Sequence, residues 1–210
     1  MKSFIITVII SVLLLNCVYA QKMTAQDSLA KKVRDSTRWA KLEATATYPL
    51  IINSKMSGVF PVTDIKDKPD PAMKYKLLMN MTEWEKDSAS VRTISGGLAE
   101  IGRIINLHIA AGVPKENLDI VVVTHGPALN AFLTNPEYQA KFKTDNPSMD
   151  ILKQFLALKV RFVACGQAEL FMDIPKEKMI PEMNTALTAR VALSTYQLKG
   201  YVLYNIENDK

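Results

Sequence analysis

Apolar residues along this chain follow two patterns, one typical of buried strands and one typical of helices. Short apolar runs predict strands over 75–81, 118–124, 160–164 and 201–206. The run at 118–124 (LDIVVVT) consists mostly of β-branched residues, as in strands that are buried on both faces. We therefore expect four such strands, separated by long intervening segments.

The intervening segments have the spacing of helices. Apolar residues recur every three or four positions in a helix predicted over 97–111, and Gly112 follows at the position of a C-terminal cap. Pro127 stands at the start of the next helical segment, where proline is tolerated. Asn146 then begins a helical segment whose apolar residues continue to Leu158.

Two further stretches complete the fold prediction. Residues 167–172 are predicted as one or two helical turns, whereas 179–186 is either a short strand or the beginning of a helix that ends near Lys199, with Gly200 as its cap. Strands that alternate with helices, without Asn-Gly hairpins, predict right-handed βαβ units. We therefore predict an α/β fold around a mostly parallel sheet covered on both faces, with no internal repeat.

The region before the first strand has a different character. Residues 24–43 fit a helix with many charges, and 48–71 is predicted as a wrapping arm or long loop because 56–71 is rich in Gly, Pro and Asp. This divides the chain into an N-terminal helix and arm over 21–73 and one domain over 74–210.

The first twenty residues have the order of a secretory signal peptide. Lys2 is followed by an apolar run from Phe4 to Leu15, and the segment ends in the small residue Ala20. We predict cleavage after Ala20 and a periplasmic or secreted protein with no membrane span left. An uncleaved anchor is the weaker interpretation, since the run is short and polar residues follow it. A lipoprotein site at Cys17 ranks lower too, because Asn16 stands where a small residue is usual.

Composition and charge exclude several classes of protein. The chain has 210 residues, 48% hydrophobic and 22% charged, which excludes disorder and low complexity. Its formal net charge of +5 is spread along the sequence rather than gathered in a basic block, so nucleic acid is not an expected partner. No phosphate-binding loop, nucleophile elbow or dinucleotide-binding turn is present, and no cofactor is indicated.

Candidate chemistry falls where two strands end. His125 and Gly126 follow the strand at 118–124, and Cys165 and Gly166 follow the strand at 160–164. Sites in parallel sheets form at this edge, and a helix N-terminus there favours the thiolate of Cys165. If the two strands are neighbours, the imidazole and the thiol could share one pocket.

Each candidate also has a purely structural interpretation. Once residues 1–20 are removed, Cys165 is the one remaining cysteine, which excludes intramolecular disulfides and leaves an inert buried thiol, a thiol paired between chains or a reactive thiol. His125 could simply bind backbone in its turn. His108 fits a satisfied helix histidine or a subunit contact. No ligand spacing supports a metal site made of these three residues.

The order of several short motifs resembles the DsrE/DsrF-like family from 75 to the C-terminus. They are Gly97-Leu98, Asn106-Leu107-His108, Ala111-Gly112-Val113, Val121-Val122-Val123-Thr124-His125-Gly126, Ala164-Cys165-Gly166-Gln167 and Gly200-Tyr201. Upstream, Tyr48-Pro49, Gly58-Val59-Phe60-Pro61-Val62 and Lys68-Pro69-Asp70-Pro71 resemble the arm of exported members.

This resemblance implies a three-layer α/β/α fold, homotrimers or homohexamers, and sulfur relay in which the strand-end cysteine, here Cys165, accepts sulfur as a persulfide. Two features depart from the relay proteins: the signal peptide, and Leu170-Phe171-Met172-Asp173 where many members have a basic residue and glycine. Fold can be inherited without function.

Two hypotheses follow. In the first, the protein carries sulfur or reacts through Cys165, His125 assists, Gln167 or amides near Gly166 bind the anion, and a sulfur donor or acceptor protein is the partner. In the second, it is a non-catalytic oligomer that binds a small ligand or metal. Gly126 and His108 are further candidates for ligand binding.

Overall fold

The computed structural model describes residues 28, 30–52, 57–82, 84 and 90–206. The chain divides into two compact units, one up to Thr45 and one from Ala46 onward. The first contains an α-helix over residues 30–43, as the charged pattern over 24–43 predicts. The predicted signal peptide at 1–20 lies outside the described residues. None of the helices in the described part of the chain is long and apolar enough to cross a membrane.

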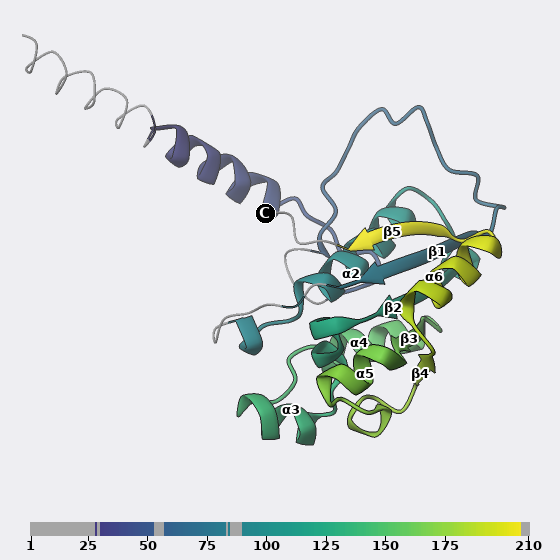
Figure 1. Ribbon diagram of the computed structural model, residues 1–210. Coiled ribbons are helices and arrows are strands. Elements are labelled where there is room, and N and C mark those ends of the chain that lie inside the picture. The colour runs from purple at the N-terminus through teal and green to yellow at the C-terminus, as the bar shows by residue number, and fades with distance from the viewer. Residues whose placement is uncertain (1–27, 29, 53–56, 83, 85–89, 207–210) are drawn as a thin grey trace, which may run out of the picture. The chain divides into compact units, whose positions relative to one another are not determined.

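The second unit is built on one five-stranded sheet in which every strand pairing is parallel (Figure 1). The strands are β1 (Tyr75–Met81), β2 (Leu118–Thr124), β3 (Arg161–Cys165), β4 (Met183–Ala186) and β5 (Val202–Ile206). Their order across the sheet is β4-β3-β2-β1-β5. The predicted α/β class with a parallel sheet is therefore confirmed, and the open question at 179–186 resolves into the short strand β4.

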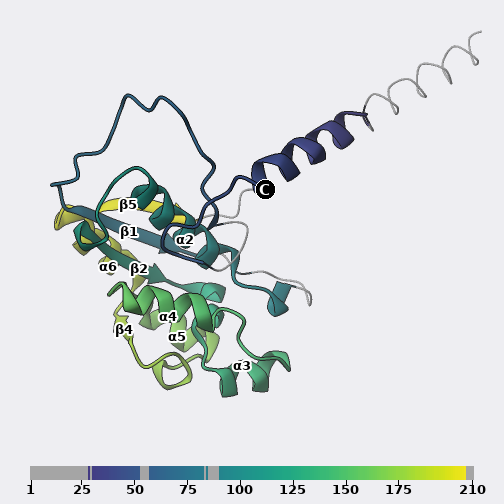
Figure 2. The ribbon, with the colours of Figure 1, turned by 180° about the vertical axis from the view of Figure 1, so that it is seen from behind.

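Helices cover both faces of this sheet and make the fold three-layered. The α-helices are α2 (Gly96–Ala110), α3 (Asn135–Phe142), α4 (Met149–Ala157), α5 (Gly166–Met172) and α6 (Ala189–Leu198). The 3-10 segments are η2 (Ser90–Arg92), η3 (Lys115–Asn117), η4 (Gly126–Phe132) and η5 (Lys176–Lys178). Helix α6 lies in front of the sheet in Figure 1, whereas α4 and α2 lie in front of it in the opposite view of Figure 2.

Side chains that alternate along the strands divide the core into two clusters. In β2, Ile120 and Val122 join the large cluster beneath α2 and α4, while Val121 and Val123 join a smaller cluster beneath α6. This is the period-two alternation of a strand with both faces covered. The sequence run LDIVVVT is apolar on both sides because both sides are buried.

Four helices, α2, α4, α5 and α6, end in the same backbone motif. After α2, the N–H of Gly112 donates to the Ile109 carbonyl and the N–H of Val113 donates to the His108 carbonyl, each at 3.0 Å. Gly112 has a φ of +104°, and Gly200 takes the corresponding place after α6 with a φ of +84°. These are the hydrogen bonds and the left-handed residue of a Schellman cap, so both predicted glycine caps are confirmed.

The cap after α4 explains why one strand begins later than its sequence predicts. Lys159 takes the left-handed place after α4 with a φ of +60°, and the N–H of Val160 donates to the Phe155 carbonyl at 3.0 Å. Val160 therefore belongs to the helix end, and β3 begins at Arg161 rather than at 160. The segment predicted as helical after Pro127 also differs in detail, because it is the 3-10 segment η4 and not an α-helix.

The arm that precedes β1 is held on α2 by one buried asparagine. Oδ1 of Asn106 accepts from the backbone N–H groups of Leu50 and Ile51 at 3.1 and 2.8 Å. Its Nδ2 donates to the carbonyls of Ile51 and Ser57 at 2.8 and 2.9 Å. Because Ile51 is buried in the large cluster, this part of the arm is core of the same unit as the sheet.

Candidate functional site

The connections that follow the neighbouring strands β3 and β4 run over opposite faces of the sheet. The helix after β3, α5, packs against η4, which contributes to the large cluster, whereas the helix after β4, α6, covers the small cluster on the other face. In open α/β sheets, ligands bind beside the carboxyl ends of strands at such a switch point. Cys165 is the last residue of β3 and stands at this position.

The surroundings of Cys165 are closely packed. It pairs in register with Ala186 of β4, is 7% exposed and belongs to the small cluster. A Cβ on the next residue, Gly166, would lie 3.0 Å from the Ala186 carbonyl oxygen and 3.1 Å from Cγ2 of Thr185. The absence of a side chain at Gly166 therefore lets the backbone of β4 approach closely.

The residue after that glycine is also engaged by the β4–α6 connection. The N–H of Gln167 donates to the Leu187 carbonyl at 3.3 Å, so this amide, one of those expected to hold an anion, already has an acceptor. The side chain of Gln167 is exposed. Its predicted role in ligand binding therefore rests on the side chain.

His125 and Cys165 come from neighbouring strands, as a shared site requires. Thr124 of β2 and Ala164 of β3 are in register, so His125 and Cys165 occupy the next level. His125 has extended backbone with a φ of −154°, and the alternation of β2 continues through it. Both residues therefore stand on the α6 face, at the carboxyl edge of the sheet.

The imidazole of His125 is bound on the side of β1. Its Nε2 lies 3.2 Å from Oδ1 of Asn80, and Nδ2 of Asn80 donates to Oδ1 of Asn205 at 3.0 Å. Burial lowers the pKa of His125 below its ordinary value of 6.5. The ring is therefore neutral at pH 7 and able to accept a proton.

Sequence reasoning missed the two asparagines. Asn80 and Asn205 are register partners in β1 and β5, and with His125 they form a row of polar side chains, which we call the asparagine row. A single asparagine in a strand gives no local signal of function. The strand order that brings these three residues together was needed to find them.

The two remaining candidates for ligand binding are Gly126, which adjoins His125, and His108, which lies on the other face of the sheet. Gly126 has a φ of +60° and forms the turn directly after His125, where glycine adopts left-handed backbone without strain. His108 lies on α2, over the opposite face of the sheet from Cys165. Its Nδ1 is 2.8 Å from the Ile104 carbonyl, and its ring packs edge-on against Tyr75, the first residue of β1. A ligand bound by His108 would not be shared with Cys165.

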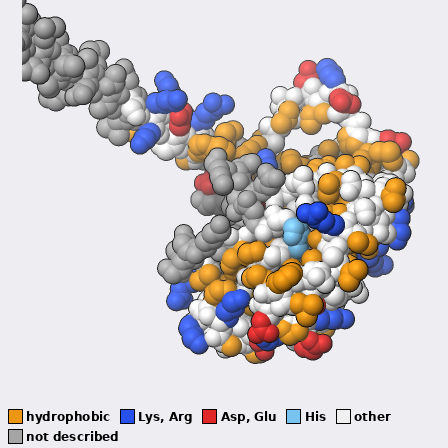
Figure 3. Space-filling view, viewed as in Figure 1, with side chains coloured by type: hydrophobic (Ala, Val, Ile, Leu, Met, Phe, Trp, Pro, Cys, Tyr) orange, Lys and Arg blue, Asp and Glu red, His pale blue; other side chains and the backbone are white. Residues whose placement is uncertain are grey.

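Exposed apolar side chains lie on the last turn of α5 and around the start of α6. Leu170 and Phe171 of α5 are 78% and 87% exposed, and Leu187 and Val191 of the β4–α6 region are exposed too. Figure 3 shows hydrophobic side chains at the surface on this side of the molecule. We call these four residues the α5–α6 apolar group.

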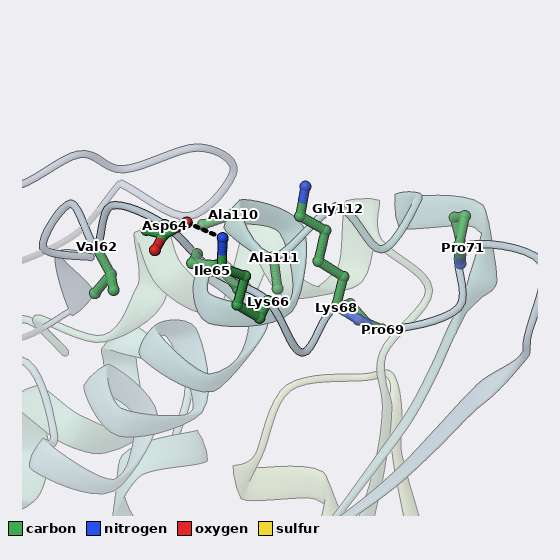
Figure 4. A pocket seen from close by; sticks show the side chains of 10 residues that line it. All are labelled: Val62, Asp64, Ile65, Lys66, Lys68, Pro69, Pro71, Ala110, Ala111 and Gly112. Atoms are coloured by element: carbon green, nitrogen blue, oxygen red, sulfur yellow. Dashed lines mark ion pairs between the residues drawn. The ribbon is translucent and has the colours of Figure 1, made fainter.

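A hollow in the second unit lies away from these candidates. A cavity of about 770 Å³ lies between the arm, from Val62 to Pro71, and the end of α2 at Gly112 (Figure 4). An ion pair between Asp64 and Lys66, at 2.5 Å, crosses part of its wall. Neither this cavity nor two others of about 450 and 260 Å³ are lined by Cys165 or His125. Within the described residues, no three His, Cys, Asp or Glu side chains are grouped so as to hold a metal ion.

Comparisons with known proteins give no family by sequence. No family model matches the chain, and no curated protein matches it. Among solved structures, it is similar to MTH1491 from Methanobacterium thermoautotrophicum, a protein of unknown function, with 16% identity and a TM-score of 0.44. It is also similar to the ychN protein from E. coli, with 18% identity and a TM-score of 0.43. Each match covers 62% of this chain and 98% of the other. The fold class given above follows from the sheet itself and does not depend on them.

Proposed function

We propose that this protein is an exported sulfur carrier of the DsrE/DsrF-like type, in which Cys165 accepts a sulfur atom as a persulfide and His125 assists. The observation that carries the proposal is the placement of a free thiol and a neutral imidazole at the same level, on the same face and on neighbouring strands. The motifs that resemble the family supply the class of reaction. Export rests on the signal-like order of residues 1–20.

The sulfur transfer proceeds without an added oxidant. The Cys165 thiol gives its proton to the imidazole of His125, and the electron pair stays on sulfur as the thiolate. The thiolate attacks the outer sulfur of thiosulfate, a new S–S bond forms on Cys165, and sulfite leaves with the electrons of the old bond. A polysulfide reacts in the same way, with a shortened polysulfide as the leaving group.

The closed surroundings of Cys165 restrict the donor. With 7% of the residue exposed, only a slim terminal sulfur can reach the thiol, as in thiosulfate, a polysulfide or the persulfide of a partner protein. The rate at which Cys165 reacts in the folded protein, compared with the unfolded chain, measures how far this packing limits access to the thiol.

The test uses the protein from Gln21 onward. Incubation with a polysulfide or thiosulfate is expected to add the mass of one sulfur atom, as measured by intact-mass spectrometry. Cys165→Ser is expected to gain nothing, and His125→Ala is expected to gain it more slowly. If Cys165 resists iodoacetamide at pH 8 until the protein is denatured, the thiol is an inert core residue and the carrier proposal fails.

A second candidate function is a non-catalytic oligomer, and the α5–α6 apolar group favours it. Exposed Leu170, Phe171, Leu187 and Val191 form the kind of surface that association covers. We propose a homotrimer or homohexamer, with a small ligand bound by the assembly. Light scattering at micromolar concentration is expected to give three or six times the monomer mass, and Phe171→Glu is expected to lower it. A monomeric wild type would contradict the assembly.

The proposal of export has its own test. Protein isolated from the native host is expected to have an intact mass that corresponds to a chain beginning at Gln21. A species with lipid on Cys17, or one that retains Met1, would overturn it.

A further inference from the structure

The asparagine row crosses the carboxyl ends of three adjacent strands. Asn205 of β5 and Asn80 of β1 are register partners, and His125 directly follows β2 on the other side of β1. Strands disfavour asparagine, because its short polar side chain competes with the backbone for hydrogen bonds. Two asparagines that face each other across parallel strands are therefore not explained by strand formation.

The hydrogen bonds of the row have one direction. An asparagine amide has a donor end and an acceptor end, and Nδ2 of Asn80 donates to Oδ1 of Asn205 at 3.0 Å. The other end, Oδ1, accepts and lies 3.2 Å from Nε2 of His125. Nε2 must then carry the proton of the ring. Since a neutral imidazole has one such proton, Nδ1 has a free electron pair.

We propose that Asn80 is a positioning residue that holds His125 in the Nε2–H tautomer, so that Nδ1 is the proton acceptor of the site. The assignment of Nδ1 as the acceptor for the Cys165 proton rests on the proposed function. The tautomer of His125 follows from the two hydrogen bonds of Asn80 and is independent of that function.

The strand order fits this role. Asn80 lies on β1 and Cys165 on β3, so they flank β2 from opposite sides. Asn80 engages one ring nitrogen from the side away from the thiol, and the other nitrogen is left for chemistry. When Nδ1 takes the proton of Cys165, the ring becomes a cation whose Nε2–H still donates to Oδ1 of Asn80. The same bond that sets the tautomer then stabilises the charged ring.

Asn205 supports Asn80 in turn. By accepting from Nδ2 it stabilises the orientation of the Asn80 amide in which Oδ1 faces His125. Asn205 is exposed, whereas Asn80 is half-buried. When Asn205 is removed, water can therefore accept from Nδ2 of Asn80 in its place, and we expect Asn205→Ala to affect the His125 tautomer less than Asn80→Ala does.

The first experiment reads the tautomer directly. Nitrogen NMR of protein with labelled histidine is expected to show His125 protonated at Nε2 at neutral pH, with Nδ1 unprotonated. Asn80→Ala is expected to mix the two tautomers, and Asn80→Asp, which keeps an acceptor oxygen, is expected to restore Nε2–H. Asn184→Ala, a matched asparagine in β4, is the control and is expected to change nothing. A wild-type ring protonated at Nδ1 would overturn the proposal.

The second experiment measures persulfide formation on the same variants. Asn80→Ala is expected to slow the gain of sulfur about tenfold, Asn205→Ala by less, and Asn184→Ala not at all. If Asn80→Ala gains sulfur as fast as wild type, the positioning role is wrong although the carrier proposal stands. If wild type gains no sulfur, the carrier proposal is wrong, and the tautomer spectra alone decide the role of Asn80.

Discussion

The two faces of the sheet are covered to very different depths. On one face, α2 and α4 lie over the large cluster, and the arm adds Ile51 on top of them. On the other face, the small cluster lies beneath α6. The candidate chemistry, Cys165 and the asparagine row, is on the thinly covered face. The deeply covered face supplies the stability that lets the other face keep polar and exposed side chains at its edge.

The largest expected effect tests this comparison with two neighbouring residues of β1. Leu78 and Met79 are both fully buried, but Leu78 faces α6 and Met79 faces α2. We expect Met79→Ala to lower the free energy of unfolding by about 4 kcal/mol and Leu78→Ala by about 2 kcal/mol, since the cost depends on how far the surroundings can collapse into the cavity. Urea denaturation measures both. Equal losses would mean that the two faces are equally rigid.

The next effect tests whether the arm is part of the deeply covered face. Asn106→Ala removes four hydrogen bonds and leaves buried backbone groups of the arm without partners. We expect the free energy of unfolding to fall by about 3 kcal/mol. Gln154→Ala is the control, because Gln154 binds the backbone of Ile52 by two exposed hydrogen bonds and its loss should cost less than about 1 kcal/mol. Similar losses in the two variants would show that the arm is held at its surface.

A smaller effect concerns the edge of the thinly covered face. In Gly166→Ala, the new methyl group would lie 3.0 Å from the Ala186 carbonyl, so β4 has to move. We expect a loss of about 1–2 kcal/mol in the free energy of unfolding, with a change in the reactivity of Cys165. Gln167→Ala, one residue later and exposed, should stay within about 0.5 kcal/mol of wild type. A stable Gly166→Ala variant would mean that β4 is not tightly held.

The smallest effect is a dependence of stability on pH. Because burial lowers the pKa of His125 in the folded state, the unfolded chain binds more protons as the pH falls through 6.5. The contribution of neutral His125 is therefore present above pH 6.5 and is lost toward lower pH. Since the ring is partly exposed, we expect the loss to be less than about 1 kcal/mol. The free energy of unfolding is measured from pH 7.5 down to pH 5 in wild type and in His125→Gln, and the difference between the two proteins gives the contribution of His125. An identical dependence on pH in both proteins would contradict the prediction.

Local patterns predict much of this fold. The bounds of β1 and β2 follow from their apolar runs, and the caps after α2 and α6 follow from Gly112 and Gly200. The start of β3 does not follow from its pattern, because the cap that precedes it uses Lys159, and a lysine gives no sequence signal for left-handed backbone. The strand β4 is short and half-exposed, so the pattern over 179–186 fits a short strand and the beginning of a helix equally well.

The site could be predicted only in part, because its residues meet through strand order. The placement of His125 and Cys165 at strand ends follows from the sequence, but their adjacency depends on β2 and β3 being neighbours. Asn80 meets His125 across 45 positions, and Asn106 meets the arm across more than 50. Such pairs give no local signal, because the chain between them decides where they lie.

The position of β5 beside β1 also orders events during folding. Asn80 and Asn205 are 125 residues apart, so the outer side of β1 stays an open strand edge until almost the whole domain has been made. Pairings this distant in sequence form slowly, and an unpaired edge can recruit strands of other chains. Nascent protein that lacks β5 is therefore the stage most exposed to aggregation, and a chaperone that covers the free edge of β1 would raise the yield of folded protein.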